Sequence, residues 1–240
     1  MSTDMLAIAD IWVYLSGSPL FALLTTLGAY LFGLTIYEKT QRNPIANPVL
    51  IAVILVSVAL LVFDIPYSQY FEGAQFVHFL LGTATVALAI PIYKGWSTLK
   101  NRMAILLVAL LAGGLTSAIV AVGVMQFMHA DPTLLQGMYA KSVTAPIAMG
   151  LAERIGAPAT LTAVFAVTTG ILGAVLGRYV FNALKVQAWW QRGFALGVAA
   201  HGIGTSRAFS VNPEAGAYAS LAMGMHGILG AVLIPWVLSL

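Results

Sequence analysis

The chain has 240 residues, of which 60% are apolar and only 8% are charged, and its mean hydropathy is +0.92. A soluble globular protein carries roughly 25% charged residues, so a surface with one third of that charge would not stay solvated in water. The composition therefore excludes soluble enzymes, DNA-binding modules and disordered chains. At about 20 apolar residues per crossing, the length allows about seven or eight helical membrane spans and leaves no room for a soluble domain.

Charge and cysteine content narrow the function classes further. The 11 Lys and Arg against 8 Asp and Glu leave a net charge of +3, which is scattered and forms no basic stripe for a nucleic-acid backbone. The absence of cysteine excludes disulfides, thiolate nucleophiles and Cys-ligated metals. The four histidines are dispersed, and the sequence contains no Ser-His-Asp pattern or phosphate loop. We therefore expect no nucleic-acid partner, no metal, no cofactor and no enzymatic activity.

Apolar runs separated by charged loops define the expected elements. Runs this long that are rich in Val, Ile and Leu predict membrane helices rather than strands. A short apolar stretch at 6–15 precedes them. In chain order, the predicted hydrophobic segments are 19–36, 48–63, 74–93, 103–128, 133–151, 158–180, 193–209 and 215–240.

The distribution of Lys and Arg predicts the orientation of the chain. Loops 38–42 and 94–102 together carry five of them, and loop 64–72, which lies between them in the chain, carries none. We therefore expect loops 38–42 and 94–102 to face the cytoplasm and the N-terminus to lie outside. Simple counting then places the basic connection 178–192 outside, against the same rule. One resolution is that segment 133–151 or 193–209 does not cross fully. Because such helices are tolerated only where they line a cavity or are buried in protein, we predict broken helices in the second half.

A short internal repeat relates the two halves of the chain. Residues 82–87 align with 139–144, and each stretch has a hydroxyl residue followed by valine, with a proline a few positions later. Paired interruptions at corresponding positions of two halves indicate a transporter binding site. The predicted fold is an all-α polytopic membrane protein with inverted repeats and two broken, crossed helices near the membrane midplane.

Lys141 is the most informative single residue. A cation in the middle of a membrane segment costs about 2.5 to 3.5 kcal/mol on insertion scales, so it needs a partner or a ligand. Ser142 and Thr144 add hydroxyl groups, and the proline that follows prevents a regular helix. If a helix restarts here, its free backbone N–H groups point toward the lysine. The ammonium and these N–H groups together suit a carboxylate. The alternative is that Lys141 reaches an interface or pairs with Glu153 or Asp131.

The run HGIGTSR at 201–207 is the second candidate site. Gly202 and Gly204 permit an unwound backbone, Arg207 can hold a carboxylate bidentately, and His201 can carry a proton near neutral pH. The alternative is a loop near the lipid headgroups in which the arginine touches phosphate. The two glycines are not a nucleotide-binding fingerprint, because no strand precedes them.

Helix packing can explain three further features of the sequence. Residues 82–85 offer hydroxyls and free amides as a third candidate site, with a Gly/Thr packing kink as the alternative. His226 lies between two glycines in the last span, where we predict packing rather than proton relay. A stripe of small residues suits close packing, either at a dimer interface or within one protomer. Its members are Gly170, Gly173, Ala174 and Gly177.

These motifs resemble the LrgB family from about residue 44 to the C-terminus. The resembling stretches are NPVLIA (47–52), LLGTATVALAIPIYK (80–94), AKSVTAPIAM (140–149), LTAVFAVTTGILGAVLG (161–177) and AHGIGTSRA (200–208). The family includes bacterial inner-membrane proteins described as antiholin-like or as murein-hydrolase regulators, and the plastid envelope glycolate/glycerate translocator. It usually has proline where this chain has Thr83 and Ala140, and threonine at Ala145, and losing both prolines is expected to relax the two helix breaks.

The resemblance and the intramembrane cations together predict a secondary active transporter of small monocarboxylates such as glycolate, glycerate, pyruvate or lactate. We expect it to work by alternating access and to lie in a bacterial inner membrane rather than a plastid envelope. Its expected partners are membrane lipid and a second copy of the chain in a homodimer. Residues 1–240 form one transporter domain, with 1–43 as dimerisation or scaffold helices and 44–240 as the LrgB-like core. The alternative is an antiholin-like regulator of murein-hydrolase export that acts with a small holin-like subunit. The expected substrate-binding residues are Thr83, Ala84, Thr85, Lys141, Ser142, Val143, Thr144, His201, Gly202, Gly204, Thr205 and Arg207.

Overall fold

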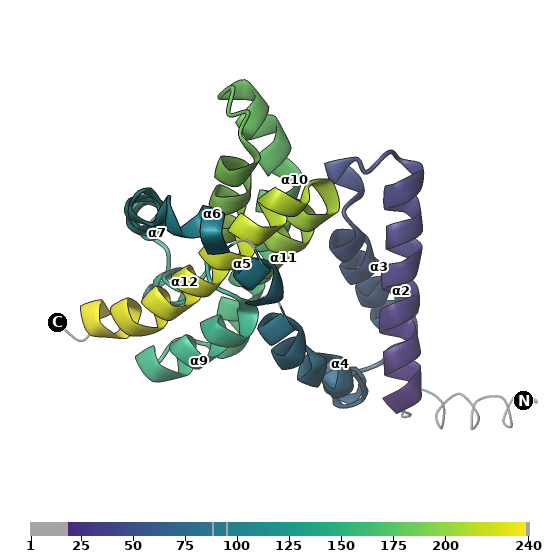
Figure 1. Cartoon of the computed structure of the whole chain (residues 1–240). Coiled ribbons are helices and arrows are strands. Elements are labelled where there is room, and N and C mark those ends of the chain that lie inside the picture. The colour runs from purple at the N-terminus through teal and green to yellow at the C-terminus, as the bar shows by residue number, and fades with distance from the viewer. Residues whose placement is uncertain (1–18, 88, 95, 239–240) are drawn as a thin grey trace, which may run out of the picture. The chain divides into compact units, whose positions relative to one another are not determined.

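The computed structural model describes residues 19–87, 89–94 and 96–238, without the side chains of His78, Leu81, Gly82, Ala84, Thr85, Pro91, Ile92, Lys94, Thr98 and Leu99. These ranges are helical and contain no strand, which confirms the all-α class (Figure 1). The helices are α2 (Pro19–Lys39), η1 (Pro44–Ala46), α3 (Pro48–Val62), α4 (Tyr67–Ala87), α5 (Ala89–Lys94), α6 (Trp96–Lys100), α7 (Met103–Phe127), α8 (Pro132–Met138), α9 (Ala145–Ile155), α10 (Ala159–Ala183), α11 (Trp189–Val211) and α12 (Pro213–Leu238).

The chain divides into two compact units, residues 1–87 and 88–240. In the first unit α2 packs against both α3 and α4. Gly33 allows the close approach of α3, because a Cβ there would lie 2.8 Å from the carbonyl oxygen of Pro48. A hydrogen bond of 2.7 Å between the hydroxyls of Thr26 and Tyr70 joins α2 to α4.

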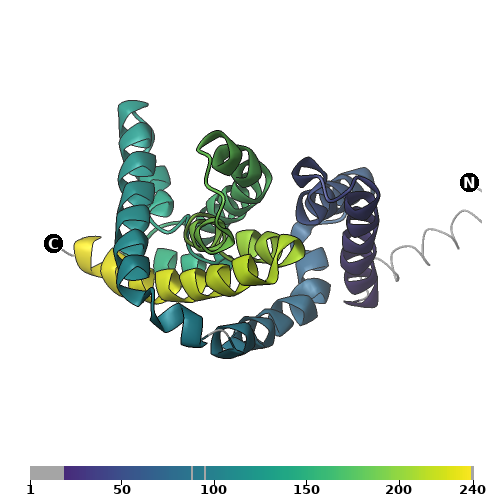
Figure 2. The ribbon, with the colours of Figure 1, turned by 45° about the horizontal axis from the view of Figure 1, so that its top comes forward.

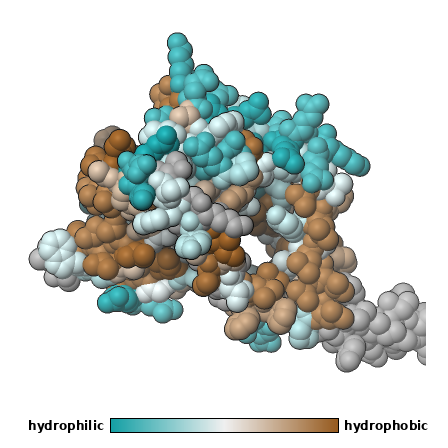
Figure 3. Space-filling view, viewed as in Figure 1, coloured by the Kyte–Doolittle hydropathy of each residue, from teal (hydrophilic) through white to brown (hydrophobic). Residues whose placement is uncertain are grey.

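Helix α3 shows how a short apolar helix is started and left exposed. The side chain of Asn47 accepts hydrogen bonds from the backbone N–H groups of Val49 and Leu50, at 2.9 and 3.1 Å, and so caps two of the free donors at the helix start. None of its 15 residues is buried. The flank of α2 is also largely apolar and exposed, and it turns hydrophilic only where the loop 38–42 follows (Figure 3). Such surfaces are suited to lipid rather than water.

Helix α4 differs from the sequence prediction. It runs without interruption from Tyr67 to Ala87, so the break predicted at 82–85 is not present in its backbone. Thr83 is exposed and its hydroxyl donates to the carbonyl of Leu80 at 2.8 Å, an ordinary helical contact. This agrees with the expectation that a chain lacking proline at position 83 relaxes the break. The side chains of Ala84 and Thr85 lie outside the described residues.

Four helices in the described ranges are long and apolar enough to cross a membrane, and they are Pro19–Lys39, Met103–Phe127, Ala159–Ala183 and Pro213–Leu238. The predicted count of eight segments and the inverted repeats stay unconfirmed. The reason is that other apolar segments fold as shorter pieces: α3 has 15 residues, and segment 133–151 is divided between α8 and α9. The structure therefore shows a membrane protein with fewer long spans than apolar runs.

The core of the second unit lies where α7, α11 and α12 meet. Helix α12 packs against α11 more extensively than any other pair of helices in the described chain (Figures 1 and 2). The main buried cluster consists of Leu106, Leu110, Phe194, Val198, Tyr218, Leu221 and Ala222. It holds the N-terminal halves of these helices together and leaves their other halves to form the site.

The small-residue stripe of α10 packs within the chain. A Cβ on Gly173 would lie 2.6 Å from the Cβ of Ala200, and a Cβ on Gly170 would lie 2.7 Å from the ring of His201. Gly177 faces Leu196 in the same way. The stripe therefore faces α11, which decides between the two predicted alternatives in favour of packing inside one protomer.

Helix α11 is broken at His201, as predicted for the 201–207 run. His201 has φ 39° and ψ −128°, so the helix consists of one limb before this residue and one after it. The second limb folds back on the first, because a Cβ on Gly204 would lie 2.7 Å from the carbonyl oxygen of Leu196. Gly193, on the first limb, touches the backbone of Ala215 in α12. Glycine is needed at both positions because the backbones are in contact.

Candidate functional site

A non-helical bridge of six residues, 139–144, separates α8 from α9. Asp131 begins α8 by accepting a hydrogen bond of 2.8 Å from the N–H of Thr133, and hydrogen bonding to the side chain and then to the backbone of Thr133 holds the pKa of its carboxyl below the usual value. Thr144 has an extended backbone (φ −63°, ψ 147°), and α9 starts directly after it. Pro146 supports the break because it has no N–H to continue an earlier helix. The predicted interruption is thus present although Ala140 is not proline.

Lys141 lies on this bridge and makes a compact polar triangle. Its Nζ donates to the Oγ of Ser117, in the middle of α7, at 2.8 Å and to the Oγ of Ser142 at 3.2 Å. The two serine oxygens are 2.6 Å apart. Within the described residues the ammonium forms no ion pair, and Glu153, one of the predicted partners, is exposed. The structure therefore gives Lys141 two hydroxyl partners where the alternative expected a carboxylate.

The hydrogen atoms of this triangle are not all used. An ammonium has three protons and each hydroxyl has one. Lys141 uses two protons on the serines, and one serine uses its proton on the other, which leaves one N–H and one O–H for further donation among the described groups. Two adjacent donors beside an unpaired positive charge match the two oxygens of a carboxylate.

Two histidines belong to the same unit as Lys141 but lie on other elements. His201 is on the break of α11, and His226 is on α12. His226 also packs against Gly114 of α7, where a Cβ would lie 2.8 Å from its Cε1 atom, so the predicted packing role is present. Lys141, His201 and His226 thus come from three separate elements of the second unit.

His201 carries a strained backbone at the centre of the second unit. Its φ of 39° is a conformation that residues with a Cβ rarely adopt. The side chain is only 3% exposed, and its Nε2 lies 2.8 Å from the carbonyl oxygen of Ala166 in α10. Since a carbonyl can only accept, Nε2 carries the proton in this contact. The hydroxyl of Thr205 donates to the carbonyl of His201 at 2.7 Å and holds the turn from the other side.

The remaining predicted residues are placed around these two breaks. Val143 is buried in a small core with Ala140 and Ala148, and it faces Gly230 of α12. Gly202 and Gly204 follow the turn of α11 at His201, and Gly204 is the contact point of the two limbs. Arg207 is partly buried on the second limb, nearly two helical turns beyond His201. Roles in substrate binding for these residues stay predictions.

A cavity of about 420 Å³ opens next to the triangle, between α7 and α12. Most of its wall consists of leucine, isoleucine and valine side chains, and its polar members are Gln126, Tyr139, Ser142 and His226. Ser142 thus faces the cavity while it contacts Lys141. The described residues hold no group of three His, Cys, Asp or Glu side chains arranged for a metal ion.

Sequence reasoning missed Ser117, which contacts both Lys141 and Ser142. Its only signal is a hydroxyl next to that of Thr116 in a long apolar span, and hydroxyl residues there usually serve helix packing. Sequence also gave no reason to place His226 and Ser142 on the same cavity, because their segments are far apart along the chain. The residue types were visible, but the spatial pairing depends on how α7 and α12 pack.

Comparison with known proteins places the chain in a family. The LrgB-like family profile matches residues 26–240. The chain belongs to the LrgB-like family. This confirms the resemblance read from the motifs.

Relatives of this LrgB-like chain match over nearly their whole length. The holin-like protein CidB of Staphylococcus aureus (strain Mu50) is 28% identical over 216 residues, which cover 90% of this chain and 94% of the relative. The uncharacterized protein YwbG of Bacillus subtilis (strain 168) is 32% identical over 218 residues, 91% of this chain and 96% of the relative. No solved structure matches. With four long apolar helices and bacterial relatives, the LrgB-like chain is an integral protein of the bacterial cell membrane.

Proposed function

We propose that this LrgB-like protein is a membrane transporter of small monocarboxylates, and that Lys141 binds the carboxylate. The observation that supports this most strongly is an ammonium in an interrupted apolar segment whose partners are the hydroxyls of Ser117 and Ser142. A buried charge without a counterion is costly. An anionic substrate would neutralise the ammonium while it is bound and would leave it unpaired after release. Such reversible binding is what a transport cycle requires.

The two helix breaks suit an alternating-access mechanism. Membrane transporters place substrate at interrupted helices near the midplane, where unwound backbone lines a cavity. Here Lys141 lies on one break, the bridge 139–144, and His201 lies on the other, the turn of α11. We propose that His201, whose ring is hydrogen-bonded to Ala166, couples proton movement to substrate movement. Arg207 and the other predicted residues of the second unit complete the site in this proposal.

A direct test uses purified protein alone in liposomes. Uptake of radiolabelled pyruvate and glycolate is measured with and without a proton gradient, and with excess unlabelled glycerate and lactate. We expect saturable uptake that the unlabelled acids reduce, and a loss of at least tenfold in Lys141→Gln. Lys141→Arg, which keeps the charge, is expected to retain more uptake than the glutamine variant. Unchanged uptake in Lys141→Gln would rule out this binding site.

A second candidate function is an antiholin-like regulator that acts with a small holin-like membrane protein. The observation favouring it is that staphylococcal relatives of this chain are named holin-like protein CidB. The same liposomes discriminate the two candidates. Uptake by the protein alone supports the transporter. No uptake alone, together with a membrane permeability that needs a co-reconstituted holin-like partner, supports the regulator.

A further inference from the structure

The cavity beside Lys141 is far more apolar than a small hydroxy acid needs. Its volume is about 420 Å³, and liquid water takes about 30 Å³ per molecule, so it holds roughly fourteen water volumes. The wall is built from α7 and α12, with Leu115, Ile119, Val122, Leu229, Leu233 and Ile234 among its members. A mostly apolar wall with a few polar groups is typical of sites that take a largely apolar ligand. The two-carbon acid glycolate would leave most of this space unfilled.

Two polar residues of the site line the cavity. Ser142 and His226 line it, and Ser142 is hydrogen-bonded to the Nζ of Lys141. On α7, Ser117 contacts the same ammonium, and the cavity continues along this helix as far as Gln126. At 1.5 Å per residue, this is a rise of about 14 Å from the charged triangle. An anion-binding group therefore stands beside an elongated apolar space.

We propose that the preferred substrates are monocarboxylates with an apolar alkyl tail, with the carboxylate at Lys141 and the tail between α7 and α12. This rests on the proposed function, and it specifies the substrate class of the same site. The charge of the ammonium matches the head of such a molecule, and the leucine-rich wall matches its tail. Each methylene group buried from water strengthens binding by about fourfold, which is ~0.8 kcal/mol converted at 25 °C.

The test is a chain-length series in competition with radiolabelled pyruvate uptake into liposomes. Unlabelled straight-chain acids from acetate to octanoate are compared, with the alcohols and amines of equal chain length as controls for membrane perturbation. We expect the half-inhibiting concentration of the acids to fall by about fourfold per carbon until the cavity is filled, and the controls to remain inactive. A flat or rising series with uptake intact would overturn the inference and leave the proposed function standing. No saturable uptake at all would overturn both.

Two glycine variants link the effect to the cavity. Gly123 lines it, and a Cβ there would meet nothing within 4 Å, so leucine can occupy the space without a clash. Gly224 of α12 is equally open but does not line the cavity. Gly123→Leu is expected to weaken competition by octanoate at least tenfold and competition by acetate far less, whereas Gly224→Leu changes the competition by neither acid. An unchanged chain-length series in Gly123→Leu would mean that membrane lipid fills the cavity, and the inference would be wrong.

Discussion

The Oγ of Ser117, in the middle of α7, lies 2.6 Å from the Oγ of Ser142, on the bridge between α8 and α9. This bond joins a long membrane helix to a break in another segment. Both oxygens also accept from the Nζ of Lys141, so the ammonium is oriented by two elements at once. A change in the distance between α7 and the bridge would therefore alter the site directly.

Replacement of Ser117 tests this orientation. Ser117→Ala removes one acceptor of the ammonium and the hydrogen-bond partner of Ser142. Losing a hydrogen bond to a charged group costs about 1.5 to 3 kcal/mol, so the KM for pyruvate uptake should rise by at least tenfold, whereas Ser117→Thr, which keeps the hydroxyl, should change it less. Thr116→Ala is the control, because Thr116 is the adjacent hydroxyl residue and is exposed. Equal KM values for Ser117→Ala and Thr116→Ala would contradict the assigned role.

The strained turn at His201 makes a prediction about stability. Glycine adopts a φ of 39° without strain, whereas alanine does not. Both His201→Gly and His201→Ala lose the ring contact with Ala166, so the difference between them isolates the backbone. We expect the glycine variant to be more stable than the alanine variant by about 1 kcal/mol, measured as the midpoint of thermal unfolding in detergent.

The control for this comparison lies on the same limb of α11. Ala199 is exposed and helical, so Ala199→Gly should lower stability by about 0.5 to 1 kcal/mol, the usual cost of glycine in a helix. The sign of the Gly–Ala difference is thus opposite at two positions two residues apart. The same sign at both would show that the turn at His201 is not strained in solution.

The sequence predicted the membrane class and both breaks of the second unit from simple physical signals. A low charged fraction determined the class, and the intramembrane Lys141, the glycines at 202 and 204 and Pro146 marked where regular helix is costly or interrupted. The break predicted at 82–85 was wrong, and the reason is physical. Gly and Thr lower helix propensity only modestly, and α4 continues through them because no proline removes a backbone hydrogen bond there.

The composition of the site was less predictable than the breaks. Ser117 contacts Lys141, and His226 lines the cavity beside it, from segments distant along the chain, and the position of His226 depends on the packing of α7 and α12. No periodicity carries that information, because long membrane helices are apolar on every side. The sequence left two alternatives for the small-residue stripe for the same reason, because it does not show which helix the stripe faces. The structure shows that Gly173 faces Ala200.

Glycines at the contact of α11 and α12 should be far less replaceable than other glycines. A Cβ on Gly193 would overlap the backbone of Ala215, which cannot move aside as a side-chain tip can. We expect Gly193→Ala to lower the thermal midpoint strongly or to prevent folding, and overpacking of this kind typically costs 1 to 3 kcal/mol or more. Gly224→Ala, with nothing within 4 Å of the new Cβ, should be neutral or stabilising. Similar midpoints for the two variants would contradict the close contact.

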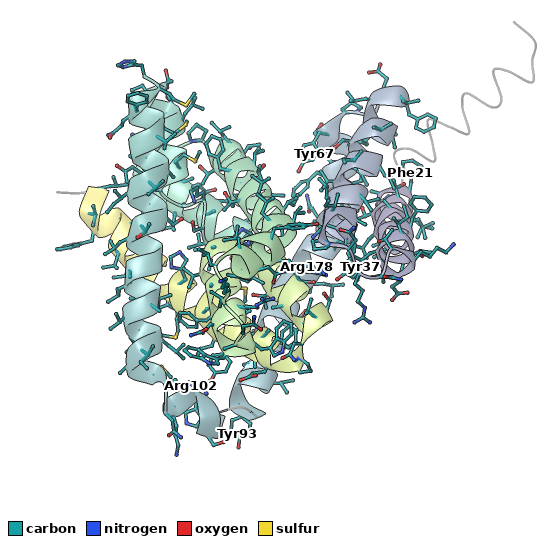
Figure 4. All side chains as sticks on the ribbon, turned by 90° about the horizontal axis from the view of Figure 1, so that it is seen from above. Phe21, Tyr37, Tyr67, Tyr93, Arg102 and Arg178 are labelled. Atoms are coloured by element: carbon teal, nitrogen blue, oxygen red, sulfur yellow. The ribbon has the colours of Figure 1, made fainter. Side chains whose placement is uncertain are left out.

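Arg102, at the N-terminal end of α7, should stabilise the contact of three helices (Figure 4). Its Nη1 donates to the hydroxyl of Tyr218 at 3.2 Å, its guanidinium carbon lies 4.7 Å from the ring centre of Trp190, and Glu214 is 4.0 Å away. The stacking and the directed bond need a planar guanidinium, so Arg102→Lys should destabilise although it keeps the charge. Because the arginine and Glu214 are partly exposed, we expect a loss of only about 0.5 to 1 kcal/mol.

A double-mutant cycle measures the part of this energy that belongs to the pair. Arg102→Lys, Tyr218→Phe and the double variant are unfolded thermally, with Arg178→Lys as the control at an exposed arginine of α10. The bond between Arg102 and Tyr218 predicts that the double variant loses about 0.5 kcal/mol less than the sum of the single losses. Strict additivity would show that the two side chains act independently. A loss in Arg178→Lys as large as that in Arg102→Lys would show that the effect belongs to any lysine replacement and not to the contact of α7 with α11 and α12.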